Sequence, residues 1–163
     1  MRTKRAPLIA VLVFSLITLA APERVLAATI FSDNFNSGYS GWMSSGTVTS
    51  TSSPAIQPNA VRLQLTGAIW RTVSTVGYTG IGVTWNLAGS VLENPDFCYV
   101  EVNTGSGWTS IFSITNGQDD SVYRTGTVTN IAGANDNPNF QIRYRAAGDA
   151  LGDNCYAEDI TVT

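Results

Sequence analysis

Short runs of alternating apolar and polar residues recur along most of the chain. In Val61–Leu65 and Ile81–Trp85 every second side chain is apolar, and Phe140–Arg145 alternates Phe, Ile and Tyr with Gln and two Arg. Such alternation places one face of a β-strand in a core and the other toward solvent. No window keeps a helical period over three turns, so the pattern predicts strands and no helices.

Ten candidate strands follow from these runs and from the Gly, Asn and Pro residues that separate them. They are Thr29–Phe35, Gly46–Thr51, Val61–Leu65, Ile69–Thr75, Ile81–Asn86, Phe97–Val102, Thr109–Ile114, Ser121–Val128, Phe140–Arg145 and Tyr156–Val162. Ten short strands predict an all-β fold, a two-sheet antiparallel β-sandwich with jelly-roll topology.

The first 27 residues differ in kind from the rest. Basic residues at 2, 4 and 5 precede the apolar stretch Leu8–Ala21, and Val25–Ala27 has the small residues that signal peptidase accepts. We therefore expect residues 1–27 to be a cleaved signal peptide and residues 28–163 to form a single secreted domain, in the periplasm or at the cell surface as alternatives. The apolar stretch is shorter than the roughly 20 residues of a spanning helix, so no membrane insertion is expected after cleavage.

Charge and composition narrow the function further. Beyond residue 27 the chain has five Arg and no Lys against eleven Asp and Glu, a net charge of −6. Such a domain offers no basic patch, which argues against nucleic acid and anionic membranes as partners. The chain also has no His, which removes Ser-His and Cys-His nucleophiles and His-bearing zinc sites.

The two cysteines, Cys98 and Cys155, are an even pair in a chain that we expect to be exported. In an oxidising compartment such a pair predicts one disulfide. The alternative, a redox-active or metal-binding pair, lacks both a C-x-x-C spacing and a neighbouring His.

Four segments, taken in order, resemble secreted jelly-roll modules of the MAM-like and carbohydrate-binding types, which are concanavalin A-like or galactose-binding-like sandwiches. The residues that carry the resemblance are Phe31–Trp42, with its D-x-F and G-W pairs, the strand and hairpin Phe97–Trp108, the strand Asn137–Ala146 and the closing strand Asp153–Val162. The resemblance implies a non-catalytic extracellular module that recognises carbohydrate. The alternative is a structural or adhesion protein that contacts other proteins at the cell surface. The extra cysteines of animal MAM domains are missing, which favours a bacterial relative.

The resemblance also implies one structural Ca²⁺, because modules of this type often hold the ion with acidic residues of the first and last strands. Asp33, Glu158 and Asp159 occupy the matching positions. Calcium takes six to eight oxygen ligands, so backbone carbonyls or waters would have to complete the shell. The alternative is that Asp33 caps a turn while Glu158 or Asp159 pairs with an Arg of a neighbouring strand.

Exposed aromatic side chains are the usual platforms for sugar rings, because a ring face can stack on a pyranose. Trp70, Trp108 and Tyr78 are the candidates. Trp42 and Trp85 are expected to pack in the core instead. Arg143 and Arg145 share one face of a strand, where they bind a carboxylate ligand or neutralise acidic neighbours.

Glycoside hydrolysis needs two carboxyl groups that face one cleft. Glu93 and Asp96 are interrupted by Pro95 in a predicted loop, and Glu101 stands alone on its strand face. The sequence therefore favours a protein without catalytic activity, and a small hydrolase is the third and weakest reading.

Overall fold

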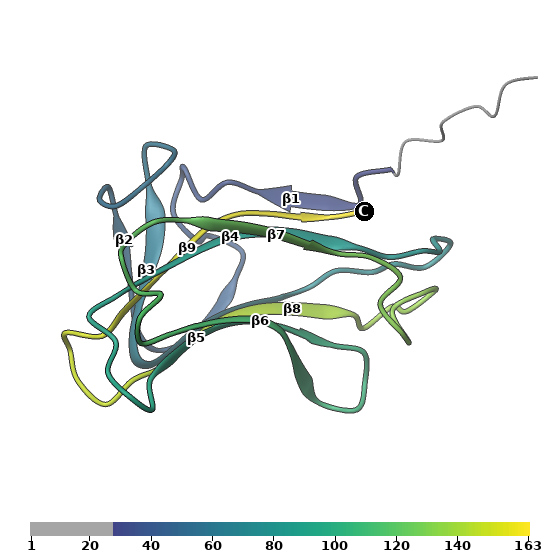
Figure 1. Ribbon diagram of the computed structural model, residues 1–163. Helices are drawn as coiled ribbons and strands as arrows, with labels where there is room; N and C mark the ends of the chain where they lie inside the picture. Colours follow the sequence, from purple (N-terminus) through teal and green to yellow (C-terminus); the bar gives the residue numbers. More distant parts are fainter. Residues whose placement is uncertain (1–27) are drawn as a thin grey trace, which may run out of the picture.

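The computed structural model describes residues 28–163 (Figure 1). The predicted signal peptide lies outside the described residues. Nine strands make up the secondary structure of the described part: β1 Phe31–Asp33, β2 Met43–Thr51, β3 Ala60–Thr72, β4 Val83–Ser90, β5 Phe97–Asn103, β6 Trp108–Thr115, β7 Arg124–Val128, β8 Gln141–Ala147 and β9 Asn154–Val162. Residues 28–163 contain no helix long and apolar enough to cross a lipid bilayer.

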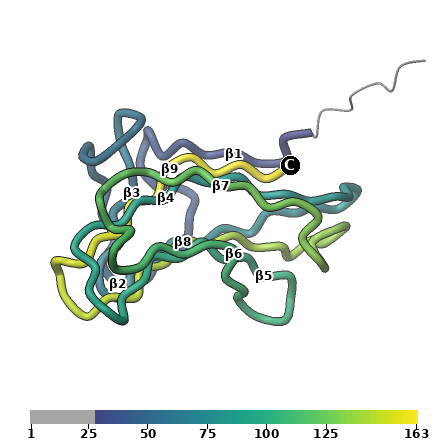
Figure 2. Tube along the Cα trace, in the orientation of Figure 1, coloured from purple at the N-terminus to yellow at the C-terminus, as the bar shows by residue number. Residues whose placement is uncertain are grey.

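The strands form two layers that face each other across the core, with β1, β9, β4 and β7 in one and β8, β5 and β6 in the other (Figures 1 and 2). The strand β3 belongs to both layers. Its first half pairs with β9, as Leu63 does with Cys155, and its second half pairs with β8, as Trp70 does with Arg143. All of these pairs are antiparallel, and the fold is the expected all-β sandwich.

A bend in β3 explains why the expected number of strands was too high by one. The two predicted strands Val61–Leu65 and Ile69–Thr75 are the two halves of β3. Leu65 has φ 56° at the point where they meet, and the register of β2 against β3 shifts between Ser45 and Thr47. The irregularity interrupts the alternation of apolar residues without ending the strand, because a bulge lets one strand turn from one sheet into another.

Apolar side chains from both layers fill the space between them. The fully buried ones include Leu63, Ile69, Leu87, Ile142 and Tyr144. The expected disulfide joins Cys98 on β5 to Cys155 on β9, so it crosses this core from one layer to the other. Both cysteines are buried, and the cross-link ties the two sheets at the end where β5 and β9 begin.

Candidate functional site

The outward side chains of β3, β8, β5 and β6 form a surface that we call the arginine face. It comprises Trp70, Tyr99, Glu101, Trp108, Arg143 and Arg145, each of them half-buried except Glu101, which is buried. The strand register builds this face directly, because Trp70 on β3 lies opposite Arg143 on β8, and Arg143 lies opposite Glu101 on β5. Alternation along each strand points the residues between them into the core.

Glu101 sits between the two arginines and binds both. Arg143 donates from Nε to Oε2 of Glu101 at 2.6 Å, and Arg145 donates from Nη2 to Oε1 at 3.1 Å. Burial on its own raises the pKa of Glu101, but hydrogen bonds from Arg145 and Arg143 outweigh that effect and hold the pKa below its usual value. The charged partners of Glu101 are thus two arginines of β8 and not a second carboxylate.

The guanidinium groups also lie over aromatic rings. That of Arg143 is 4.0 Å from the ring centre of Trp108, and that of Arg145 is 4.3 Å from the ring centre of Tyr99. Cation–π contacts of this kind hold both partners in a fixed orientation. Trp108 and Tyr99 are thus set in place by the same two arginines that hold Glu101.

Trp70 differs from the other rings of the arginine face. Among the described residues it takes no part in the ring–ring and cation–π contacts. A row of polar groups crosses the sheet beside it, where Gln141 donates to Thr72 at 3.2 Å and Asn103 donates to Gln141 at 3.1 Å. The face therefore combines an unstacked indole with amide, hydroxyl and guanidinium groups.

Tyr78 is not part of the arginine face. It lies in the loop between β3 and β4 and is 42% exposed, and its backbone carbonyl accepts a hydrogen bond from the N–H of Asp136 in the loop before β8. Trp42 and Trp85 are buried in the core, as the sequence predicts. Of the three aromatic candidates, the strands bring together only Trp70 and Trp108.

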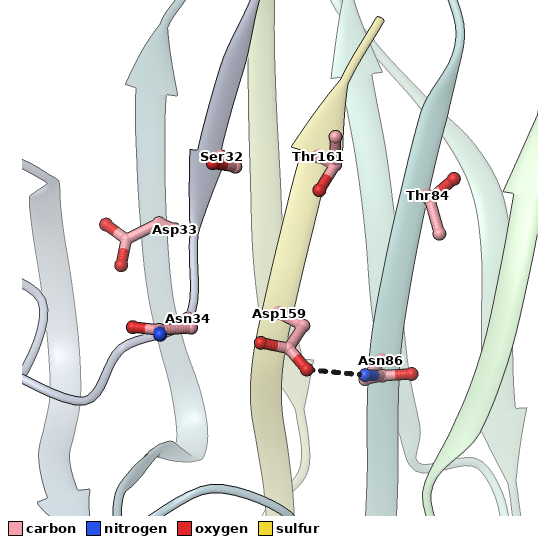
Figure 3. A pocket seen from close by; sticks show the side chains of 7 residues that line it. All are labelled: Ser32, Asp33, Asn34, Thr84, Asn86, Asp159 and Thr161. Atoms are coloured by element: carbon pink, nitrogen blue, oxygen red, sulfur yellow. Dashed lines mark hydrogen bonds between the residues drawn. The ribbon is translucent and has the colours of Figure 1, made fainter. Parts of the chain in front are cut away.

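Asp33 and Asp159 line a polar hollow of about 600 Å³ on the outside of the other layer (Figure 3). Asp159 accepts a hydrogen bond from Asn86 at 3.1 Å. Both oxygens of Asp33 are already used, because Oδ1 accepts from the N–H of Phe35 at 2.9 Å and Oδ2 accepts from the indole N–H of Trp42 at 2.8 Å. Asp33 thus fixes the turn after β1 and holds Trp42 in place.

Glu158 faces elsewhere, so the structure does not bring the three predicted calcium ligands together. Its carboxylate is fully buried and accepts hydrogen bonds from the N–H groups of Ile56 at 2.9 Å and Gln57 at 2.7 Å. The two N–H groups belong to the loop between β2 and β3, which covers Glu158 and separates it from Asp33 and Asp159. Burial raises the pKa of Glu158, although the two N–H groups offset part of the effect. The alternative pairing of these acids with Arg143 or Arg145 was also wrong, since both arginines bind Glu101.

No protein-family model and no curated protein sequence matches this chain. Solved structures match its fold. The carbohydrate-binding module TmCBM61, in complex with β-1,4-galactotriose, has a TM-score of 0.61 at 20% identity over 80% of this chain and 93% of its own. The carbohydrate-binding module CBM36, in complex with calcium and xylotriose, has a TM-score of 0.56 at 15% identity over 82% of this chain and 100% of its own.

The K1 cleaved adhesin domain of Lys-gingipain from Porphyromonas gingivalis W83 shares the fold as well. Its TM-score is 0.57 at 13% identity, over 84% of this chain and 98% of its own. These identities are low, so the likeness concerns the fold: the chain has the β-sandwich of carbohydrate-binding modules. A fold of this kind supports many functions, and the site has to be argued from its residues.

Proposed function

We propose that the protein is a secreted, non-catalytic module that binds extracellular carbohydrate on the arginine face. The observation that carries the proposal is the placement of Trp70, an unstacked indole on the outer face of the sheet beside polar groups. Sugars are bound by this combination, because an aromatic face covers the apolar side of a pyranose while fixed polar groups bind its hydroxyls. The fold shared with carbohydrate-binding modules supports the proposal.

Each group on the face has a role in this proposal. Trp70 is the stacking platform, and Gln141 and Thr72 hydrogen bond to hydroxyls beside it. Arg143 presents N–H groups between the two indoles, while its ion pair with Glu101 keeps it in one orientation. A site whose side chains are already held in place loses little conformational freedom on binding. Trp108, held under Arg143, extends the surface for a second sugar unit.

A glycan array, followed by calorimetry, tests the proposal. The array includes β-1,4-galactotriose and xylotriose, the ligands of two proteins with this fold. We expect wild type to bind at least one oligosaccharide and Trp70→Ala to lose at least tenfold in affinity, about 1.4 kcal/mol. Tyr78→Ala is the matched control, because it removes an exposed aromatic ring away from the face, and we expect it to bind like wild type.

Two other outcomes would contradict the proposal. Release of new reducing ends from the bound oligosaccharide would show a hydrolase. If the wild type binds no oligosaccharide on the array, the adhesion alternative is favoured. One feature of the surface also supports that alternative, because Met43 on β2 lies opposite Trp70 and is 49% exposed. Such an apolar pair can seat a protein partner as well as a sugar.

A further inference from the structure

Four carboxylates converge at the end of the sandwich that carries the disulfide. Glu93 and Asp96 come from the loop between β4 and β5, and Asp149 and Asp153 come from the loop between β8 and β9. We call these four residues the acidic loop cluster. Carboxylate oxygens of Glu93, Asp96 and Asp149 all lie within 4.8 Å of one another. Three negative charges at such distances, with a fourth on Asp153 nearby, repel strongly unless a cation or protons neutralise them.

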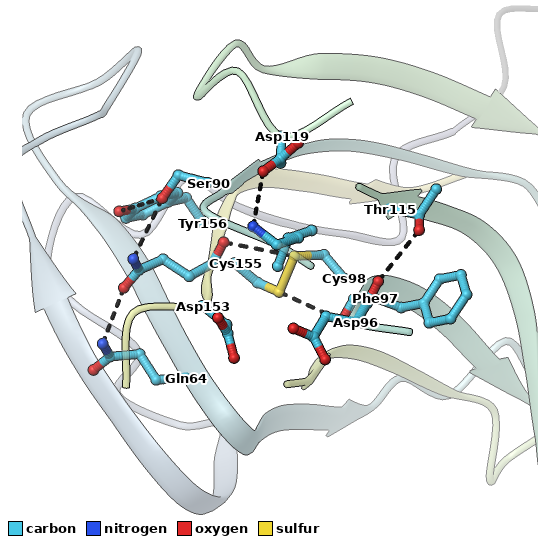
Figure 4. The surroundings of a disulfide bond; sticks show 12 residues. Gln64, Ser90, Asp96, Phe97, Cys98, Thr115, Asp119, Asp153, Cys155 and Tyr156 are labelled. Carbon is cyan, nitrogen blue, oxygen red and sulfur yellow. Dashed lines mark hydrogen bonds between the residues drawn. A yellow bond between two sulfur atoms is a disulfide. The ribbon is translucent and has the colours of Figure 1, made fainter. Parts of the chain in front are cut away.

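The disulfide brings the two loops together. Cys98 follows Asp96 by two residues, and Cys155 follows Asp153 by two residues, so the cross-link between the cysteines sets the two acids side by side. Figure 4 shows the carboxylates of Asp96 and Asp153 facing each other beside the sulfur atoms. Turns within each loop fix them further, as the N–H of Asp96 donates to the carbonyl of Glu93 at 2.7 Å.

The carboxylate of Asp153 is buried, and only one of its two oxygens is hydrogen-bonded. Its side chain is 2% exposed, and its Oδ2 accepts hydrogen bonds from the N–H groups of Asp149 at 3.0 Å and Ala150 at 2.7 Å. Its Oδ1 is buried and has no hydrogen-bond partner. The negative charge of Asp153 is the main cause of a raised pKa at Glu93, and burial followed by the charge of Asp153 raises the pKa of Asp96. The carboxylate that carries this oxygen faces that of Asp96 (Figure 4).

No basic side chain of residues 28–163 pairs with the acidic loop cluster. The described part has five arginines: Arg124 binds Asp120, Arg143 and Arg145 bind Glu101, Arg71 lies over Phe31, and Arg62 donates to Thr49. A buried carboxylate oxygen without a partner is a costly arrangement for a protein. Residues 28–163 therefore leave this oxygen to a proton or to a cation from outside the described part.

From this geometry we infer that the acidic loop cluster binds one Ca²⁺, held by Glu93, Asp96, Asp149 and Asp153. Calcium binds oxygen at 2.3–2.6 Å, which allows ligand oxygens up to about 5 Å apart, and the oxygens of Glu93, Asp96 and Asp149 lie within that limit. Magnesium demands shorter bonds in a strict octahedron and keeps its waters, so it fits four crowded carboxylates less well. The exposed residues Glu93 and Asp149 leave the ion open to water, which completes its shell.

Glycoside hydrolysis is a poorer use of the same residues. It needs two carboxyl groups on opposite sides of a bond in a cleft. Here the carboxylates crowd together, and none of them lines either the hollow at Asp33 or the second hollow, between β6 and the loop that follows β7. The crowding suits a single small cation.

Calorimetry with CaCl₂, on protein stripped with EDTA and dialysed, tests the inference. We expect one ion per chain, with weaker binding of MgCl₂ to the same protein. Asp149→Asn and Asp153→Asn should each lower the calcium affinity at least tenfold. Asp159→Asn is the matched control: it removes the same charge from the polar hollow of Figure 3 and should bind calcium like wild type.

Because Asp149 is exposed, its substitution leaves the fold intact, and a circular dichroism spectrum checks this for every variant. The inference is overturned if wild type binds no calcium at millimolar concentration. It is also overturned if Asp159→Asn loses the ion while Asp149→Asn keeps it. The result is independent of the glycan array, since a chain that binds calcium here and no sugar would contradict only the proposed function.

Discussion

The arginine face and the acidic loop cluster use carboxylates in opposite ways. On the face, two arginines from the neighbouring strand neutralise Glu101, and its pKa falls below the usual value despite burial. In the cluster, Asp96 and Asp153 are as deeply buried but have only loop N–H groups as partners, and the pKa of Asp96 is raised, first by burial. The charge of Glu101 is neutralised by arginines of the same protein. The charges of the acidic loop cluster have no such partner among residues 28–163, so they favour binding of a cation from solution.

The disulfide lies beside the acidic loop cluster and away from the arginine face. Its removal is therefore the change with the largest expected effect, and it should affect the cluster more than the face. Replacing both Cys98 and Cys155 by Ala should lower the free energy of unfolding by about 2–5 kcal/mol, because the unfolded chain regains freedom. Urea denaturation followed by Trp fluorescence measures the change. We expect the same variant to bind calcium more weakly, since the two acidic loops are no longer tied. An unchanged free energy of unfolding would contradict this account.

Replacing Glu101, the acid of the arginine face, should have the second-largest effect on stability, after removal of the disulfide. Glu101→Gln leaves Arg143 and Arg145 with a neutral partner, which we expect to cost about 1–3 kcal/mol at pH 7. The folded-state pKa of Glu101 is lowered, so its contribution is present above the unfolded value of about 4.3 and is lost as the pH falls through the folded value. Unfolding of both proteins at pH 7 and pH 3 measures this.

The advantage of wild type over Glu101→Gln should therefore be smaller at pH 3 than at pH 7. A difference that stays the same at both pH values would show that the charge of Glu101 is not what stabilises the face.

Replacing Asp149 of the acidic loop cluster should change the free energy of unfolding least of the three variants. In EDTA, Asp149→Asn should change the free energy of unfolding by less than about 0.5 kcal/mol, because Asp149 is exposed and its charge is repelled by its neighbours. Added CaCl₂ should raise the melting temperature of wild type and of Asp159→Asn but hardly that of Asp149→Asn. A large loss of stability in EDTA would mean that Asp149 is already compensated, and the contrast between the regions would fail.

Much of the fold follows from the sequence. Alternation in strands such as Val61–Leu65 and Phe140–Arg145 identifies the core residues, and the burial of Trp85 was predicted from it, whereas that of Trp42 was predicted from the Gly-Trp pair. The joining of the two halves of β3 was not predictable, because a bulge at Leu65 looks like the end of a strand. The same holds for the loop between β2 and β3, whose N–H groups at Ile56 and Gln57 hold Glu158 away from the predicted calcium site.

The two sites were predictable to different degrees. Trp70 and Trp108 were recognised one at a time, but only the pairing of β3, β8 and β5 shows that Arg143 and Glu101 lie between them. The acidic loop cluster was missed, although the sequence holds a signal for it. Asp96 and Asp153 each precede a cysteine by two residues, so a predicted disulfide already implies that they are neighbours.

The indole N–H signals of the four tryptophans in an NMR spectrum test the account most directly, because each reports one place in the molecule. Trp42 is bound to Asp33 and Trp85 is buried, so both serve as internal controls. We predict that an oligosaccharide selected on the array shifts the signals of Trp70 and Trp108 and leaves Trp42 and Trp85 unchanged, while CaCl₂ instead shifts the backbone amides of Gly148 and Gly152. An oligosaccharide that binds without moving the Trp70 signal would contradict the account.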